Sequence, residues 1–160
     1  MNTYEGSLEG GDLSIALVAS RFNEALVERL LEGAVQALDR NGVGNENISV
    51  TWVPGAFELP IAAKRLAASG EVDAVICIGA IVRGETPHFD FVAGAAATGI
   101  TEAALSTGVP ITFGVLTTDD ADQALDRAGG KMGNKGEEAA LAALEMANLF
   151  GALPKPTGEI

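Results

Sequence analysis

The chain has 160 residues, 48% of them hydrophobic, so it is long and apolar enough to bury a sizeable core and is not expected to be disordered. Its formal net charge of −12, without a basic stripe, argues against nucleic acid as a partner. No apolar run approaches the ~20 residues of a membrane span, no secretory signal is visible and the single cysteine fits a reducing compartment, so we expect a cytoplasmic protein without a membrane partner.

Strand-like and helix-like patterns alternate along the chain. Apolar residues recur at helical spacing after Glu24 and stop at Asn41-Gly42, and Pro60 is tolerated only in the first turn of its helix. In chain order we expect a strand at 13–19, a helix at 24–40, a strand at 48–53, a helix at 58–69, a strand at 73–80, a helix at about 89–106, a strand at 110–116, a helix at 120–128 and a final helix at 137–150.

Two connections complete this pattern. Thr118 or Asp119 is expected to cap the helix at 120–128, and the glycine-rich segment 129–136 is expected to be a flexible connection between helices. We find no internal repeat and no linker, so we predict one domain over 1–160. Residues 1–11 would form an N-terminal arm, and 151–160 are a candidate for a disordered tail.

Strands that alternate with helices of this length predict an α/β fold, in which helices cover both faces of a parallel sheet. Ligands of such sheets bind beyond the carboxyl ends of the strands. His88, the only histidine, therefore lies at the same edge as Phe22 and Glu58. The loops expected at this edge are Ser20–Asn23, Pro54–Glu58, Gly79–His88 and the segment after Leu116.

Several kinds of chemistry do not fit the sequence. One histidine and one cysteine cannot supply a His/Cys zinc shell, and Cys77 lies in an apolar strand where it is expected to be a small core residue. The chain has no G-x-S-x-G elbow, no P-loop and no G-x-G-x-x-G fingerprint. Proton transfer and anion binding remain as the kinds of chemistry that the residues of this chain could carry out.

Each candidate for these two tasks also has a plain alternative. His88 could transfer protons near neutral pH, or be a helix-start histidine bonded to backbone. The residues 84–86 could hold a phosphate, or form a turn and an N-cap. Arg127 could clamp a phosphate, or pair with a surface acid.

The same holds for the aromatic and acidic candidates. Phe22 could stack on a ring, or belong to the rim of the core. Glu58 could accept hydrogen bonds from a ligand, or be a first-turn acid favoured by the helix dipole. Phe113, inside a predicted strand, is expected to be a core residue.

Five stretches together resemble the lumazine synthase family, from about Tyr4 to Phe150. They are SRFNEALVERLLEGA, VPGAFELP, GAIVRGETPHFDFV, PITFGVLTTDDADQALDRAG and GNKGEEAALAALEMANL. The motifs R-G-x-T-P-H-F-D and G-N-K-G are specific. The resemblance implies a flavodoxin-like three-layer α/β/α sandwich around a four-stranded parallel sheet. It makes the N-terminal segment a candidate for pairing with a neighbouring subunit.

The resemblance also implies a reaction that needs no metal and no cofactor. Members of the family join 5-amino-6-(D-ribitylamino)uracil to 3,4-dihydroxy-2-butanone 4-phosphate. The products are 6,7-dimethyl-8-ribityllumazine, phosphate and water, in the penultimate step of riboflavin biosynthesis.

Matching the motifs residue by residue implies roles within one subunit. Phe22 would stack on the pyrimidine ring. The ribityl chain and the ring edge would be held by Ala56, Phe57 and Glu58, and the uracil would be contacted by backbone groups of Ala80, Ile81 and Val82. The phosphate would be bound by Glu85 and Thr86, and His88 would transfer protons. Phe113 and Arg127 would reach the site from a neighbouring subunit, Arg127 at the phosphate, and Lys135 would assist. Phe91, where many relatives carry Tyr, is expected to lie outside the chemistry.

The family's assembly implies a homopentamer with its sites between subunits. The segment 129–136 has no extra residues, which favours a 60-subunit icosahedral shell, and riboflavin synthase is a candidate partner. Three alternatives remain: the archaeal type of riboflavin synthase, a flavin- or lumazine-binding module without turnover, and a purely structural shell.

Overall fold

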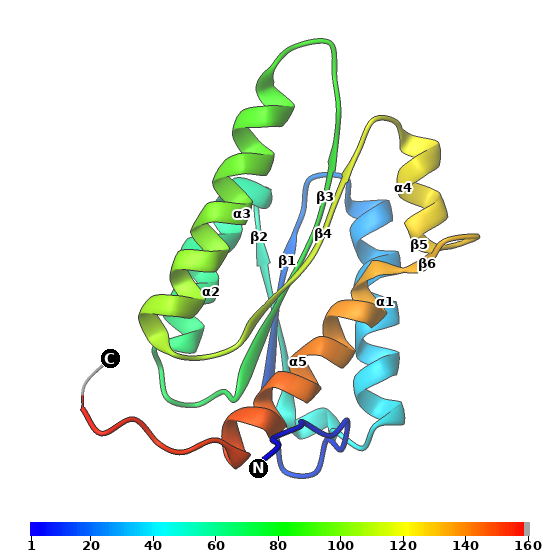
Figure 1. Ribbon diagram of the computed structural model, residues 1–160. Coiled ribbons are helices and arrows are strands. Elements are labelled where there is room, and N and C mark those ends of the chain that lie inside the picture. Colours follow the sequence, from blue (N-terminus) through cyan, green and yellow to red (C-terminus); the bar gives the residue numbers. More distant parts are fainter. Residues whose placement is uncertain (159–160) are drawn as a thin grey trace.

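Four predicted strands form one parallel sheet in the computed structural model, which describes residues 1–158 (Figure 1). The strands are β1 (Ile15–Ser20), β2 (Ile48–Val53), β3 (Ala74–Val82) and β4 (Ile111–Thr118), in the order β2-β1-β3-β4. Every residue of β1 is buried, as expected for a central strand covered on both faces. This order is that of flavodoxin-like folds, so the predicted fold class is confirmed.

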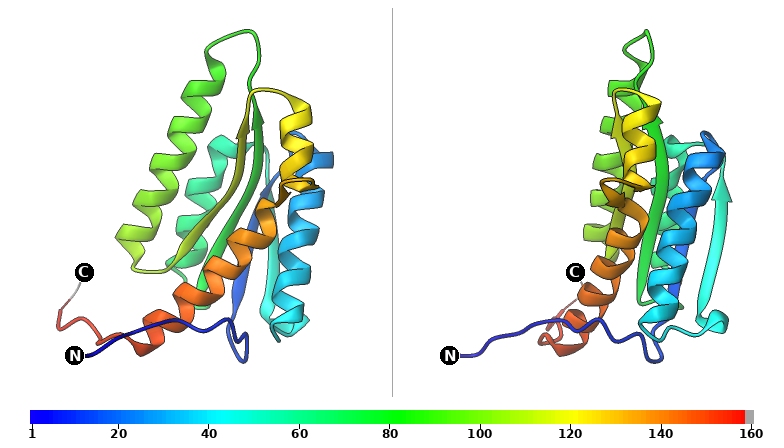
Figure 2. Two further views of the ribbon diagram at one scale, coloured as in Figure 1. Left: turned by 45° about the vertical axis from the view of Figure 1, so that its right-hand side comes forward. Right: turned by 90° about the vertical axis from the view of Figure 1, so that its right-hand side faces the viewer.

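Helices cover both faces of the sheet and make it the middle of three layers (Figures 1 and 2). On one face lie α1 (Glu24–Arg40), α4 (Ala121–Arg127) and α5 (Lys135–Ala152); on the other lie α2 (Leu59–Ala67) and α3 (His88–Thr107). Successive side chains of a strand point to opposite faces. Leu17 thus packs in the core under α1 and α5, and Val18 packs in the core under α2 and α3.

Some element ends differ from the predictions. The helix expected at 58–69 is a 3₁₀ turn (Ala56–Glu58) followed by α2, which places Pro60 in its first turn. A 3₁₀ turn at Asn45–Asn47 was not predicted. β4 continues two residues beyond its apolar run, because Thr117 and Thr118 still pair with the end of β3.

The predicted cap of α4 is wrong. Thr118 is the last residue of β4, and its hydroxyl donates to the carbonyl of Asp120 at 2.9 Å. Asp120 is the N-cap instead, because its Oδ1 accepts from the N–H of Gln123 at 2.8 Å.

The glycine-rich segment 129–136 contains a short antiparallel hairpin, formed by β5 (Ala128–Gly130) and β6 (Gly133–Asn134). Directly after it, α5 begins at Lys135, two residues before its predicted start. The cause is Asn134, whose Oδ1 accepts from the N–H groups of Gly136 at 2.9 Å and Glu137 at 3.1 Å.

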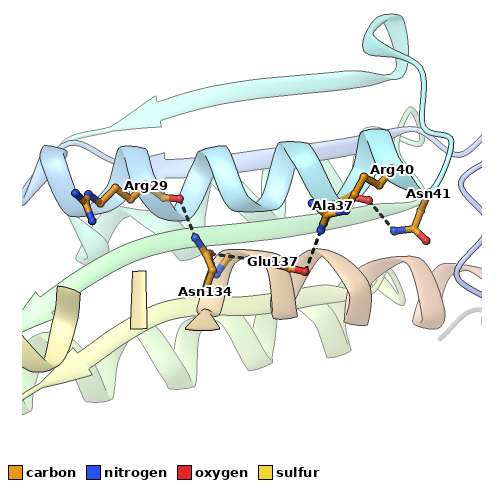
Figure 3. A network of polar contacts seen from close by, with 7 residues as sticks. Arg29, Ala37, Arg40, Asn41, Asn134 and Glu137 are labelled. Carbon is orange, nitrogen blue, oxygen red and sulfur yellow. Dashed lines mark hydrogen bonds and ion pairs between the residues drawn. The ribbon is translucent and has the colours of Figure 1, made fainter. Parts of the chain in front are cut away.

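Asn134 also joins α5 to α1 (Figure 3). Its Nδ2 donates to the carbonyl of Arg29 at 3.0 Å, and one turn further along α5 Glu137 pairs with Arg40 at 2.9 Å. Gly136 approaches α1 so closely that a Cβ there would overlap the carbonyl of Leu30. The G-N-K-G motif thus holds the two helices together.

The N-terminal arm lies against the end of α5 of its own chain. Asn148 Nδ2 donates to the carbonyls of Ser7 and Glu9, both at 2.9 Å. Pairing of this arm with a neighbouring subunit stays a prediction.

The predicted tail at 151–160 begins too early, since Gly151 and Ala152 belong to α5. The last two residues of that prediction, 159–160, lie outside the described residues. Among the helices of residues 1–158, none is both long and apolar enough to cross a membrane.

Candidate active site

A cleft of about 740 Å³ lies beyond the carboxyl ends of β1, β2 and β3, beside the start of α3. Most of the predicted site residues line it, and they come from three different loops and the end of β3. They are Phe22, Ala56, Phe57, Glu58, Ala80, Ile81, Val82, Thr86 and His88. A hollow of similar size, about 760 Å³, lies at the opposite end of the sheet and holds none of them.

Phe22 is held at the cleft by an extension of the β1–β2 pairing. The N–H of Arg21 donates to Val53 O at 2.8 Å, and that of Phe22 donates to Pro54 O at 3.0 Å. Asn23 then takes a left-handed conformation (φ 60°), and its Nδ2 donates to Ala80 O at 2.8 Å. The Phe22 side chain is 73% exposed and belongs to neither core cluster, which disfavours the core-rim alternative.

The turn after β2 supplies the second wall. Ala56 is buried beneath it, whereas the Phe57 side chain is 63% exposed. Glu58 Oε2 accepts from the N–H of Gly55 at 3.0 Å. One oxygen of this carboxylate therefore stabilises the turn, and the structure gives its Oε1 no hydrogen bond within residues 1–158.

The end of β3 offers backbone groups to the cleft. On one side β3 pairs with β4 as far as Val82, but on the other side its pairing with β1 stops at Ile78. The residues 79–82 of β3 therefore lie beyond its register with β1, and there Ala80 O accepts from the side chain of Asn23. Three residues of this stretch, 80–82, line the cleft.

The loop from β3 to α3 brings Gly84, Thr86 and His88 to the cleft. The alternative that Thr86 caps α3 is wrong, because Pro87 is the N-cap and no side chain caps the helix. His88 is the first residue of α3 and is exposed. Within residues 1–158 its side chain makes no hydrogen bond to backbone, which disfavours the plain helix-start alternative.

Arg83, at the start of this loop, contacts several charged and aromatic groups. Its Nε donates to Asp119 Oδ1 at 3.0 Å, its Nη1 lies 3.4 Å from Asp90 Oδ1, and its Cζ lies 4.3 Å from the centre of the Phe89 ring. The hydrogen bond to Asp119 is the main reason why the pKa of Arg83 is raised above its ordinary value.

Three predicted residues do not line the cleft of this chain. Glu85 is exposed on the loop, outside the lining. Phe113 is half-buried in β4, beside Cys77, and packs against the core under α2 and α3. Arg127 lies in a separate cavity of about 400 Å³ that Lys135 also lines.

The separate cavity lies between β4, α4 and α5. Arg127 Nη1 donates to the carbonyl of Gln123 at 3.2 Å, and among residues 1–158 no acid pairs with it. The surface-pair alternative for Arg127 is therefore disfavoured. Lys135, by contrast, lies 3.7 Å from Glu138 Oε2.

Predictions from the sequence also concern the single cysteine and the arrangement of metal-binding residue types. Cys77 is a buried free thiol, and burial raises its pKa to about 12, as expected for a core residue. Among residues 1–158, no three His, Cys, Asp or Glu side chains are grouped as metal ligands.

Seven residues that line the cleft were not among the predicted site residues: Asn23, Pro54, Gly55, Gly84, Phe89, Phe91 and Val92. Phe91 was expected to lie outside the chemistry, yet its side chain is 74% exposed at the cleft. The sequence did indicate a place at the cleft for Phe89 and Phe91, because both follow the candidate His88 in the first turn of a helix.

A flavodoxin-like sheet with a cleft of aromatic, acidic and backbone groups beyond its strands defines an α/β protein with a small-molecule site. A model of the 6,7-dimethyl-8-ribityllumazine synthase family matches residues 12–151, and the chain belongs to this family. The resemblance seen in the motifs is therefore confirmed. Membership indicates a lumazine synthase activity in riboflavin biosynthesis, and thus a transferase-type enzyme.

Proposed function

We propose that the chain condenses 5-amino-6-(D-ribitylamino)uracil with 3,4-dihydroxy-2-butanone 4-phosphate to give 6,7-dimethyl-8-ribityllumazine. The observation that carries the proposal is the cleft itself, which gathers ring-stacking, backbone, carboxylate and imidazole groups from separate loops. Family membership supplies the choice of substrates.

The pyrimidine half of the cleft suits a flat polar ring with a polyol chain. Phe22 offers an exposed aromatic face on which a ring can stack. The end of β3 along 80–82 lies beyond its register with β1, and its backbone N–H and C=O groups suit the polar edge of a uracil. The Glu58 carboxylate accepts hydrogen bonds only, as needed for ribityl hydroxyls.

The phosphate half lies at the start of α3. No side chain caps this helix, and the N–H of Asp90 donates to Pro87 O at 3.1 Å. The N–H groups of His88 and Phe89 and the Thr86 hydroxyl are therefore the groups that would bind an anion. In our proposal Glu85 also lies beside this phosphate. Arg127 of a neighbouring subunit would complete the site with a guanidinium, which suits bidentate contact with phosphate.

The reaction balances without an oxidant, a reductant or a cofactor. The 5-amino nitrogen attacks the ketone, and loss of one water gives an imine. Removal of a proton from the carbon beside the imine then supplies the electron pair that expels phosphate from the next carbon. Loss of phosphate leaves an enol, which takes up a proton at its terminal carbon and loses its hydroxyl proton to give a methyl ketone. The ribityl-bearing amine attacks this new carbonyl, and loss of a second water closes the ring.

His88 is our candidate for moving the protons in these steps. Its imidazole is exposed at the cleft and can both accept and donate a proton. Orientation of the two bound reactants contributes the rest of the acceleration, up to about 7–11 kcal/mol in favourable cases.

The placement of Phe113 and Arg127 outside the cleft of their own chain favours a shared site between subunits. We therefore propose a homopentamer, and a 60-subunit shell with riboflavin synthase as a partner. We also propose that it acts as a single domain in the cytoplasm, where a free thiol such as Cys77 is stable.

The first test mixes the purified protein with both substrates and follows lumazine fluorescence against the uncatalysed background. Product formed faster with enzyme supports the proposal. Lumazine supplied alone tests the archaeal-type riboflavin synthase, which would convert it. Tight lumazine binding without any turnover would replace the proposal by a binding module, and folded protein with neither activity nor binding would leave a structural shell.

A further inference from the structure

The side chain of Arg83 contacts three groups in two separate segments, and the proposed reaction gives it no role. Asp119, its hydrogen-bond acceptor at 3.0 Å, lies between β4 and α4. Asp90 and Phe89, its other contacts, lie in the first turn of α3. One guanidinium therefore joins the loop after β4 to the start of the helix that carries His88.

The loop between Arg83 and α3 has few other anchors. Within residues 1–158, no backbone–backbone hydrogen bond between segments involves 84–86, and all three residues are exposed. Pro87 caps α3 without a side-chain hydrogen bond. Before the loop, the N–H of Arg83 donates to the carbonyl of Thr118 at 2.8 Å, which fixes the backbone from which the guanidinium reaches out.

The acceptor of Arg83 is itself held in place. The N–H of Asp119 donates to Gln123 Oε1 at 2.9 Å, and Gln123 lies in α4, the helix that ends at Arg127. The contacts of Arg83 thus form a continuous link from α4 to the first turn of α3.

We propose that Arg83 is a positioning residue, which fixes His88 and Phe89 at the cleft by holding the first turn of α3 against the β4–α4 connection. The inference rests on the proposed function for the meaning of this placement. A planar guanidinium suits the role, because its fork binds two carboxylates in fixed directions while its face packs on an aromatic ring.

The physical signature of this role is a loss of rate without a loss of fold. Ion pairs as exposed as these contribute little to overall stability. By contrast, a displacement of a catalytic group by about 1 Å can lower a rate by about 10²-fold.

The test compares Arg83→Ala and Arg83→Lys with the wild type by steady-state kinetics, thermal unfolding and amide hydrogen exchange over 90–94, the first hydrogen-bonded amides of α3. Arg65→Ala is the matched control, since Arg65 is an exposed arginine on α2 outside the cleft that makes no ion pair within the described residues. We expect Arg83→Ala to lower kcat by about 10- to 100-fold, to speed exchange over 90–94 and to leave the midpoint of unfolding within about 3 °C. Arg83→Lys should recover part of the rate, because it keeps the charge and loses the fork.

Unchanged kcat and unchanged exchange in Arg83→Ala would overturn the inference. A lowered midpoint with faster exchange in β1 and β3 would overturn it too, in favour of a structural role. If the wild type forms no product, the proposed function fails by itself. The exchange data then still decide the positioning role, which faster exchange confined to 90–94 supports and unchanged exchange refutes.

Discussion

The side-chain amide of Asn134 donates a hydrogen bond to the backbone carbonyl of Arg29 at 3.0 Å, across the contact between α5 and α1. The same side chain caps α5 through the N–H groups of Gly136 and Glu137. G-N-K-G, one of the two motifs that carried the resemblance, therefore has a structural reason that is independent of any role of Lys135 in catalysis.

Asn134→Ala should lower the free energy of unfolding by about 1–3 kcal/mol, because it removes an N-cap and a hydrogen bond between helices. Urea unfolding followed by circular dichroism measures the change. Asn45→Ala is the control, since Asn45 is exposed and its side chain makes no hydrogen bond within the described residues. Equal effects of the two substitutions would show that the Asn134 network contributes nothing.

Gly136→Ala should be destabilising by about 1–3 kcal/mol, the range of an overpacked core. The added Cβ would overlap the carbonyl of Leu30, which is backbone and cannot move away alone. Gly151, in the same helix, has no atom near an added Cβ, so Gly151→Ala should be neutral or stabilise by up to about 1 kcal/mol. The same urea titration compares both variants, and a neutral Gly136→Ala would contradict the close approach of the two helices.

Periodicity was enough to predict the sheet and its five main helices, since patterns of apolar residues report which face of an element is buried. Element ends that depend on other segments were missed. Thr117 and Thr118 look like loop residues and become strand only because β3 lies beside them. The role of Asn134 as the N-cap of α5 was not predicted, because the residue lies in a glycine-rich segment. An asparagine before a helical run is nevertheless a typical N-cap.

The candidate site could likewise be predicted from the sequence only in part. Loops after parallel strands meet at one edge, so the joint placement of Phe22, Glu58 and His88 followed from topology. Asn23 was missed because its position depends on its left-handed backbone conformation. Phe91, by contrast, lies in the predicted helix three residues after His88, so helical spacing could have placed it at the cleft. The roles of Phe113 and Arg127 came only from the family resemblance and stay predictions, because they concern a second subunit.

Phe22→Ala should raise KM for the pyrimidine substrate about tenfold or more, since stacking of a base on an aromatic ring contributes about 1–3 kcal/mol. Its effect on stability should be small, because the side chain is 73% exposed. Steady-state kinetics with each substrate varied in turn measures the change. Phe150→Ala, an exposed phenylalanine at the far end of α5, is the control and should leave KM unaltered.

His88→Ala should lower kcat by about 10²–10⁴-fold, the usual contribution of a general acid or base. Activity should remain above the uncatalysed background, because orientation of the reactants does not depend on the imidazole. The rate should be measured across the pH range for wild type and variant. A variant whose turnover equals that of the wild type at every pH would refute the proton-transfer role.

Arg127→Ala should impair use of the phosphate substrate severely, and a mixing experiment tells whose site the arginine serves. If Arg127 completes the cleft of a neighbour, subunits of Arg127→Ala and His88→Ala that are refolded together form sites in which both residues are intact. With equal amounts and random assembly, about a quarter of the sites combine His88 from one subunit with Arg127 from the next. The mixture should therefore regain about a quarter of the wild-type rate, well above either variant alone.

Phe22→Ala mixed with His88→Ala is the control, because both residues line the cleft of one chain and no mixed site can restore both. Recovery in neither mixture would show that Arg127 does not act across a subunit boundary, and the separate cavity that it lines would then need another role.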